Sequence, residues 1–391
     1  MGGSSVQAIL QASLDEYLTS HRLPEYQRHA LWCLRHCRTS ALGGHTEVCP
    51  QGHVEQVWYN SCRHRSCPQC AYREIDRWLE AKREQLLPCD HYHVIFTLPS
   101  ELRLLWRWNP LEMGQLLFQV VRDTLMSLLE DPRHLGARPG ILATLHTWGR
   151  TLVLHPHVHC LITGGGLTAN GDWKAVRDGF LLPVRVLRVI YRGKLLSKLE
   201  TLLREGRLSL PGNLTVERAL GLLKTVARKT WNVCIRERYR HGEGVATYLA
   251  RYMRGGPIKN HRLVASDESS VTFRYGDHQD LDTQGRPTEK VMKLPVSELL
   301  NRLLLHVPLP GFHVVRGYGL YSRTGRKDLE TCRSRLMGAP ETTPRAPAAR
   351  PEKRHGREPR RCPVCERELI RGEELPRSGL SPPGKRGGSP E

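Results

Sequence analysis

The stretch LVLHPHVHCLITGGG, residues 152–166, carries a histidine at every second position: His155, His157 and His159. Successive side chains of a β-strand point to opposite faces, so an extended chain would place all three imidazoles on one face. Proline inside a strand marks an edge or a bulge, and a bulge at Pro156 would turn His155 away from the other two. The pattern predicts a strand on which His157 and His159 bind one divalent cation, with His155 as a candidate third ligand.

The sequence around this stretch predicts a mixed α and β architecture. The segment ILATLHTWG, residues 141–149, reads as a strand that forms a hairpin with the histidine stretch around Gly149, and HYHVIFTLP, residues 91–99, reads as another strand. Apolar residues recur with helical spacing in several other segments. These predicted helices cover residues 6–36, 71–88, 101–130, 184–204, 216–228, 244–255 and 296–307, and further extended segments cover 270–277 and 311–322.

The charge of the chain favours a polyanionic partner. Its 391 residues contain 59 Lys and Arg against 39 Asp and Glu, a formal net charge of +20. A surplus of this size, dominated by Arg, is typical of nucleic-acid-binding proteins. The sequence has no run of about 18 apolar residues that would span a membrane. The N-terminus lacks the pattern of a signal peptide, so we expect a cytoplasmic bacterial protein without a membrane partner.

Cysteines gather near the N-terminus. Seven of the 12 lie between residues 33 and 89. Clustered Cys with nearby His and no secretion signal indicates metal binding rather than disulfides. The strongest element is Cys67-Pro-Gln-Cys70, since a C-x2-C turn supplies two zinc ligands, and Cys49 with His53 is the natural second pair. Cys62, Cys37 and His45 exceed four ligands, which leaves open a second zinc or a supporting role. The predicted zinc ligands are Cys49, His53, Cys62, Cys67 and Cys70.

Two tyrosines follow in the segment ATYLARYMRGG, residues 246–256. Tyr248 and Tyr252 are spaced i, i+4, which places them on one face of a helix. Packing alone could explain such a pair. However, cationic neighbours stabilise a phenolate and bind phosphates. The candidate cations here are Arg251, Arg254 and Lys259, and the Arg63 and Arg65 of the cysteine segment would similarly contact DNA.

Over residues 5–325 the chain resembles the IS91-type transposases, two-tyrosine members of the HUH endonuclease superfamily. The resemblance rests on CRTSALGGHTEVC, YNSCRHRSCPQC, HVIFTLP, LHTWGRTLVLHPHVHCLITGGG, YLARYMRG and RGYGL. It implies that His157-Val158-His159 is the HUH motif, which binds Mg²⁺ or Mn²⁺ with a third polar ligand. It also implies that Tyr248 and Tyr252 are the nucleophiles that form a 5′-phosphotyrosine. The third ligand is not fixed by a motif, and His155 and Glu243 are candidates.

The resemblance implies an α+β fold: an HUH-type nuclease domain with a central antiparallel sheet flanked by helices, an N-terminal zinc-binding module and a disordered C-terminal tail. The expected boundaries are 1–88 for the module, 89–325 for the nuclease domain and 326–391 for the basic, Pro-rich tail. The tail contains Cys362-x2-Cys365, and two ligands alone are not a site. The implied function is rolling-circle transposition on single-stranded DNA at transposon ends and target DNA. Alternatives are a non-catalytic zinc-dependent DNA-binding regulator and a zinc hydrolase that uses all three histidines.

Overall fold

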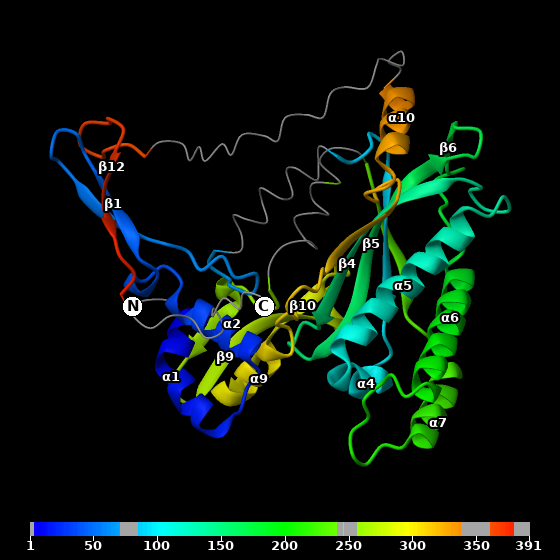
Figure 1. Cartoon of the computed structure of the whole chain (residues 1–391), viewed down its shortest axis with the longest axis horizontal. Coiled ribbons are helices and arrows are strands. Elements are labelled where there is room, and N and C mark those ends of the chain that lie inside the picture. Colours follow the sequence, from blue (N-terminus) through cyan, green and yellow to red (C-terminus); the bar gives the residue numbers. More distant parts are fainter. Residues whose placement is uncertain (1–3, 71–84, 241–244, 246–255, 338–359, 379–391) are drawn as a thin grey trace, which may run out of the picture. The chain divides into compact units, whose positions relative to one another are not determined.

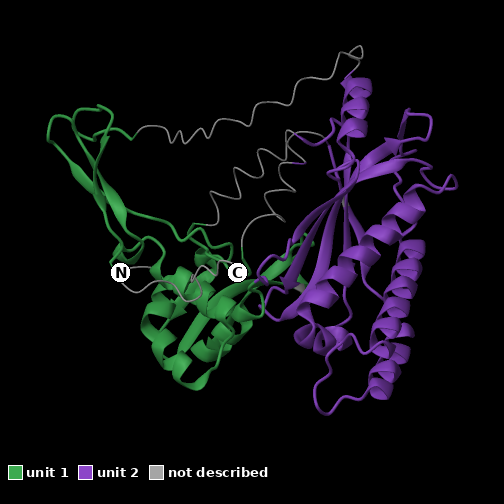
Figure 2. Cartoon of the chain, viewed as in Figure 1, with its two compact units in different colours: residues 1–75, 255–307, 342–391 green, residues 76–254, 308–341 purple. Residues whose placement is uncertain are grey.

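The computed structural model describes residues 4–70, 85–240, 245, 256–337 and 360–378 (Figure 1). The chain divides into two compact units that interleave along the sequence (Figure 2). Unit 1 comprises residues 1–75, 255–307 and 342–391, and unit 2 comprises residues 76–254 and 308–341. The sequence predicts consecutive domains, with boundaries at residues 88 and 325. In the structure, residues 255–307 and the end of the chain instead belong to the same unit as the N-terminal segment.

Unit 2 is built on one antiparallel sheet with strand order β11-β4-β5-β3-β7, in which β6 pairs with β5. The strand that contains the histidines is central, and β4 and β5 form the predicted hairpin. The strands are β3 (His91–Thr97), β4 (Arg138–Trp148), β5 (Leu154–Leu167), β6 (Trp173–Ala175), β7 (Val233–Tyr239) and β11 (Val315–Gly319).

Helices α5 and α6 lie against one face of this sheet (Figure 1). Along α6 the buried residues recur every four positions, from Leu187 through Tyr191 to Leu203, which is the spacing of a helix with one apolar face. Phe96 of β3 meets Tyr191 edge to face, with ring centroids 5.0 Å apart. Phe96 points away from the neighbouring odd-numbered residues of its strand, so the helices cover the face opposite to that of the histidines. In the part of unit 2 that the structure describes, the α-helices are α4 (Arg103–Trp108), α5 (Pro110–Leu129), α6 (Val184–Arg204), α7 (Val216–Ala227) and α10 (Arg326–Met337).

The described residues of unit 1 form three α-helices and two small antiparallel sheets. Tyr17 donates a hydrogen bond to Asn301 at 2.6 Å, and Gln27 donates to the carbonyl of Leu304 at 3.1 Å, so the N-terminal helices are tied to a helix almost 300 residues later. The helices are α1 (Val6–Ser20), α2 (Glu25–His36) and α9 (Val296–Leu304). One sheet has the order β10-β9-β8, with β8 (Leu263–Ser266), β9 (Ser270–Leu281) and β10 (Pro287–Pro295).

The second sheet of unit 1 joins the two ends of the sequence. Its order is β12-β1-β2, with β1 (Gly44–Val48), β2 (Glu55–Tyr59) and β12 (Ile370–Leu375). The tail therefore contains two ordered segments, α10 and β12, that its composition did not predict. The predicted helices over residues 71–88 and 244–255 lie largely outside the described residues. Every helix in the described part of the chain is too short or too polar to cross a membrane.

Candidate metal centres

Three histidines meet on one face of the unit 2 sheet. His157 and His159 are alternate residues of β5, and His146 of the neighbouring β4 pairs directly with His157. Directly opposed residues of antiparallel strands project to the same face. Each of the three offers a ring nitrogen, and these atoms all lie within 4.8 Å of one another. The ring centroids of His146 and His159 are 4.6 Å apart, and those of His157 and His159 are 4.8 Å apart.

The register of the hairpin explains why His155 is not the third member. Leu154 and His157 are three positions apart on β5. Their partners on β4, Trp148 and His146, are two positions apart, so the register shifts by one residue here. One extra residue on one strand is a β-bulge, which is the irregularity that Pro156 predicts. The imidazole of His155 is outside the group.

Hydrogen bonds at Nδ1 orient the two rings of β5. Nδ1 of His157 lies 2.6 Å from the carbonyl oxygen of His155, to which it donates. Nδ1 of His159 lies 2.8 Å from Nε2 of His93 on β3, and both residues are buried. In each ring, Nε2 is therefore the nitrogen that a cation would take. Partners that fix the ring and its tautomer in this way are typical of metal-binding histidines.

Burial keeps these rings neutral. Burial lowers the pKa of His157 to about 3 and holds the pKa of His159 well below its usual range. Repulsion from His146 and the other nearby imidazoles, if they were protonated, acts in the same direction on the pKa of both rings. Burial, with Arg236 nearby, also lowers the pKa of His93 to about 3. Neutral imidazole is the form that binds a cation, so near pH 7 no proton has to leave first. Three imidazoles suit Mn²⁺ and other transition metals better than they suit Mg²⁺.

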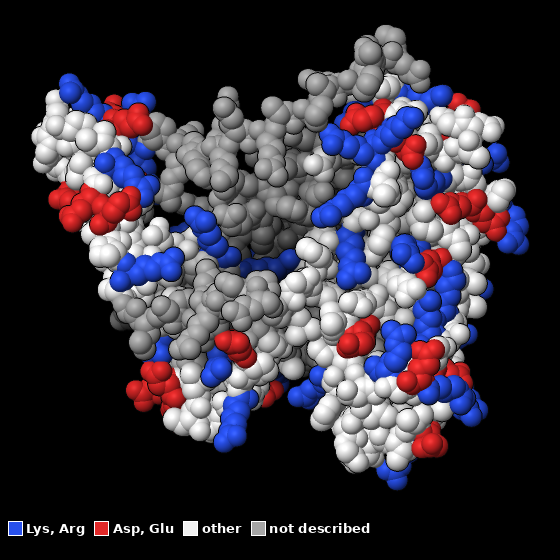
Figure 3. Space-filling view, viewed as in Figure 1, with Lys and Arg blue, Asp and Glu red and all other residues white. Residues whose placement is uncertain are grey.

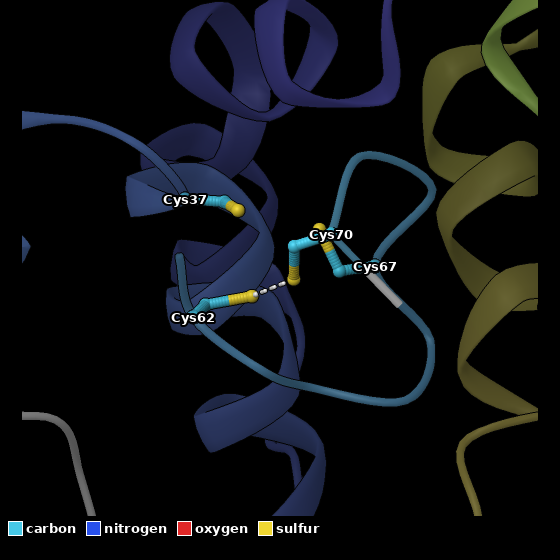
Figure 4. Close-up of side chains that lie close together, drawn as sticks. All are labelled: Cys37, Cys62, Cys67 and Cys70. Atoms are coloured by element: carbon cyan, nitrogen blue, oxygen red, sulfur yellow. Dashed lines mark hydrogen bonds between the residues drawn. The ribbon is translucent and has the colours of Figure 1, made fainter. Parts of the chain in front are cut away.

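Four cysteines form a second candidate metal centre in unit 1. Cys37 follows α2, Cys62 follows β2, and Cys67 and Cys70 lie on the loop beyond, with all four sulfurs turned toward one another (Figure 4). The Sγ atoms of Cys62 and Cys70 are 3.4 Å apart, much farther than the roughly 2.0 Å of a disulfide. All four thiols are free. Four thiolates at this spacing match the donor set of a structural zinc site.

Polar contacts hold this cluster to the first helix of the chain. Gln7 of α1 donates to the carbonyl oxygen of Cys37 at 2.8 Å and accepts a hydrogen bond of 2.6 Å from Gln69. One side chain thus connects the end of α2 with the Cys67–Cys70 turn. The four ligands come from separate segments that a metal would link, so ligation would supply folding energy directly.

Cys49 and His53 are not part of this cluster. The sequence paired them with Cys67 and Cys70, whereas the structure places them beside Cys362 and Cys365 of the tail. The reason lies in the β1–β2 hairpin: Cys49 and His53 occupy its turn, while Cys62 follows the last residue of β2. Cys49 and His53 therefore lie at the turn end of the hairpin, whereas Cys62 follows its open end. The five-residue strands β1 and β2 separate the two positions.

Comparison with known proteins identifies the family. Residues 9–98 match a family model described as "Transposase zinc-binding domain" of the IS91 type, and residues 140–328 match one described as "Putative transposase". The chain is 37% identical over 378 residues to "Putative transposase y4qJ" of Sinorhizobium fredii, which covers 93% of both chains. The chain belongs to the IS91-type transposase family.

A second relative of this transposase is the "Transposase for insertion sequence element IS801" of Pseudomonas savastanoi pv. phaseolicola. The two are 28% identical over 353 residues, which is 85% of this chain and 80% of that one. Among solved structures, TrwC complexed with a 27-mer DNA matches with 15% identity and a TM-score of 0.23, over 40% of this chain and 70% of that one. A likeness this slight says nothing further about the transposase.

Three of the five cations that the sequence assigned to DNA binding are described. Arg63 and Arg65 are exposed on the loop between Cys62 and Cys67, and Lys259 is exposed in the same unit. Gly256, just before Lys259, packs against Ser66 of that loop. On the face in Figure 3, Lys and Arg alternate with Asp and Glu instead of gathering in one patch. The other two cations, Arg251 and Arg254, lie outside the described residues, as do Tyr248, Tyr252 and Glu243.

Sequence reasoning missed the ligands that come from other strands and segments. His146 was not a candidate, because it pairs with His157 only through the register shift at the bulge, which counting residues along the hairpin does not supply. Cys37 was noted only as surplus to four ligands. The Cys362-x2-Cys365 motif was recognised as half of a site, but nothing in the sequence indicated its partner.

Proposed function

We propose that this transposase cleaves and rejoins single-stranded DNA at the ends of an insertion sequence, through a 5′-phosphotyrosine on Tyr248 or Tyr252 and with a divalent cation at His146, His157 and His159. The observation that carries the proposal is the convergence of three imidazoles from the paired strands β4 and β5 on one face of the sheet, with Nδ1 of both β5 histidines already hydrogen-bonded. A transposase has to polarise a phosphodiester, and the ring nitrogens of this cluster can bind a cation that would do so. A bound Mg²⁺ or Mn²⁺ would polarise the scissile phosphate and neutralise its charge.

The chain's own residues then supply the nucleophile. The phenolate oxygen of one tyrosine attacks the phosphorus atom, the bond from phosphorus to the 3′ oxygen breaks, and that oxygen leaves and takes up a proton. One phosphodiester bond has replaced another, so the energy of the broken bond is retained in the phosphotyrosine. A 3′-hydroxyl of target DNA can reverse the step without ATP. The second tyrosine allows a second strand to be cleaved before the first is released.

The zinc module would hold the substrate strand. Arg63 and Arg65 extend from a loop whose two ends are the cluster members Cys62 and Cys67. Fixing both ends of the loop lowers the entropy that its arginines lose when they bind phosphate. Arg offers a planar fork of donors that matches phosphate oxygens.

The proposal is tested by trapping the covalent intermediate. The full chain, incubated with labelled single-stranded DNA from an element's end and Mn²⁺, should give a protein–DNA adduct that survives a denaturing gel. Tyr248→Phe and Tyr252→Phe should each lower strand transfer, and the double variant should give no adduct. An adduct that persists in the double variant would refute the tyrosine assignment.

Further variants separate the alternatives. His157→Ala with His159→Ala should abolish cleavage and leave DNA binding intact, because these rings would bind the cation, whereas Arg63 and Arg65 would bind the DNA. A DNA-binding regulator would give no adduct under any condition. A zinc hydrolase would cleave with water, so the Tyr248→Phe/Tyr252→Phe variant would keep its activity. Full cleavage in EDTA would rule out the role of the cation.

A further inference from the structure

The turn of the β1–β2 hairpin and the tail segment just before β12 bring four metal-ligand side chains together. Cys49 and His53 come from the turn, and Cys362 and Cys365 come from a Cys-Pro-Val-Cys sequence. The Sγ atoms of Cys49 and Cys365 are 3.5 Å apart. Nδ1 of His53 lies 3.7 Å from Sγ of Cys49 and 4.0 Å from Sγ of Cys362. Tetrahedral zinc would space such atoms by about 3.6–3.8 Å.

We propose that Cys49, His53, Cys362 and Cys365 bind a second zinc ion, which fastens the tail segment 360–378 to the β1–β2 hairpin. This site differs from the four-cysteine cluster, since it takes two of its ligands from beyond residue 360. It also lies partly outside the region, residues 9–98, that matches the zinc-binding domain. The donor set is three thiolates and one imidazole, a combination typical of structural zinc.

Backbone hydrogen bonds to sulfur show that both halves have the conformation of zinc-binding turns. The amide of Gln51 donates to Sγ of Cys49, and the amide of Val364 donates to Sγ of Cys362, each at 3.4 Å. In the four-cysteine cluster the amide of His64 donates to Sγ of Cys62 at the same distance. Such donors favour the thiolate, which is the form that binds a metal. The same local arrangement thus occurs at both clusters.

The small sheet around this site lacks an apolar core that could hold it together. Val57 and Tyr59 of β2 are 49% and 42% exposed, and Ile370 of β12 is 52% exposed. The two cysteines Cys49 and Cys362 are nevertheless almost completely buried, at 4% and 1% exposure. Short strands with exposed apolar residues are marginally stable by themselves. Buried thiols at the turn end of such a sheet are the expected result when a metal replaces the hydrophobic core.

Other contacts place the tail segment in one register on the hairpin. The amide of Glu373 donates to Oγ1 of Thr46 at 2.9 Å. Arg360 forms a 2.9 Å ion pair with Glu47, and its guanidinium lies 3.3 Å from the centroid of the Trp58 ring. Both partners of Arg360 belong to the hairpin. The tail thus reaches the metal ligands along a specific path, and the pairing of Cys362 and Cys365 with Cys49 is part of one continuous interface.

The primary test counts zinc in the purified full-length chain. Cys362→Ser with Cys365→Ser should lower the zinc content by one ion per chain relative to Cys234→Ser, a half-buried cysteine outside both clusters. The histidine cluster is present in both proteins, so any zinc that it holds cancels in the difference. An unchanged zinc content would overturn the proposal.

Exchanging the imidazole for a thiolate gives a second readout. His53→Ala should lose the same zinc ion, and His53→Cys should retain it, with the Co²⁺-substituted protein changing from a mixed sulfur and nitrogen spectrum to an all-sulfur one. Equal zinc contents in His53→Ala and the wild type would exclude His53 as a ligand and refute the four-residue site.

A measurement on the wild-type chain does not depend on any variant folding. N-ethylmaleimide should label Cys362 and Cys365 slowly in the zinc-loaded protein and rapidly after chelation, whereas Cys234 should react equally in both. Amide hydrogens of β12 should likewise exchange faster after chelation. Labelling of Cys362 and Cys365 at one rate with and without zinc would contradict a metal at this position.

Discussion

His93 provides a sharp test of how the histidine cluster is oriented. Its Nε2 lies 2.8 Å from Nδ1 of His159, and it is fully buried on β3. If His159 binds a cation through Nε2, its single ring proton is on Nδ1 and is donated to His93. The change His93→Phe removes that acceptor while filling a similar volume. A buried donor left without its acceptor costs about 1–3 kcal/mol.

This cost predicts how much affinity for the cation the variant loses. At about 1.4 kcal/mol per factor of ten, 1–3 kcal/mol corresponds to a loss of about 5- to 150-fold. The loss of an outer partner typically weakens metal binding by about 10- to 100-fold, which agrees. We therefore expect His93→Phe to raise the Mn²⁺ concentration needed for half-maximal DNA nicking by this factor. The maximal rate at saturating Mn²⁺ should change much less.

The assay compares three variants in Mn²⁺ titrations of nicking, alongside direct Mn²⁺ binding without DNA. His93→Gln retains an acceptor oxygen and should recover most of the affinity. His91→Phe is the matched control, because His91 is also buried on β3 but its Nε2 pairs with the hydroxyl of Tyr321 at 2.7 Å. An equal loss of Mn²⁺ affinity in His91→Phe and His93→Phe would show that the effect is general destabilisation. Wild-type affinity in His93→Phe would refute the orienting role.

The remaining predictions concern the ligand set, the cation and the sheet. His146→Ala should weaken Mn²⁺ binding by more than the roughly 100-fold that is typical of losing an outer partner. His155→Ala should bind Mn²⁺ normally, because that residue supports the cluster through its backbone carbonyl, which alanine retains. The reverse order in a Mn²⁺ titration would overturn the choice of His146. After EDTA treatment and dialysis, nicking should return at lower Mn²⁺ than Mg²⁺, and a preference for Mg²⁺ would argue against three imidazole ligands. A Cβ at Gly319 would overlap the carbonyl oxygen of Pro139 at a positive φ of 57°, so Gly319→Ala should lower the free energy of unfolding by about 2 kcal/mol. Gly193 is in the middle of α6, where a Cβ would meet no neighbouring atom, so Gly193→Ala should raise the free energy of unfolding by about 0.5–1 kcal/mol. Equal urea midpoints for Gly319→Ala and Gly193→Ala would contradict both expectations.

Local patterns in the sequence predicted the central elements of unit 2. The alternation around His157 and the apolar runs on either side placed β5, β4 and β3, because a strand and a hairpin are determined by a few neighbouring residues. The bulge at Pro156 followed from the missing amide of proline. The small strands β8 and β10 were not predicted, since Leu294 is the one buried residue of β10 and the strand shows little apolar periodicity. Both strands are placed by their pairing with β9, which lies between them in the sheet.

Each metal centre also combines ligands that are close in the sequence with ligands that are farther apart in it. Each contains a pair or triplet that a short spacing identifies: His157 with His159, Cys67 with Cys70, and Cys49 with His53. Each is completed by a residue that only the topology supplies. His146 arrives through strand pairing, Cys37 through the end of α2, and the tail cysteines across 309 residues of sequence between His53 and Cys362. The free-energy cost of closing a loop grows only slowly with its length, so a ligand hundreds of residues away can still complete a site. Ligand spacing in a sequence therefore identifies candidate ligands, but assigning them to particular ions requires the strand register and the path of the tail.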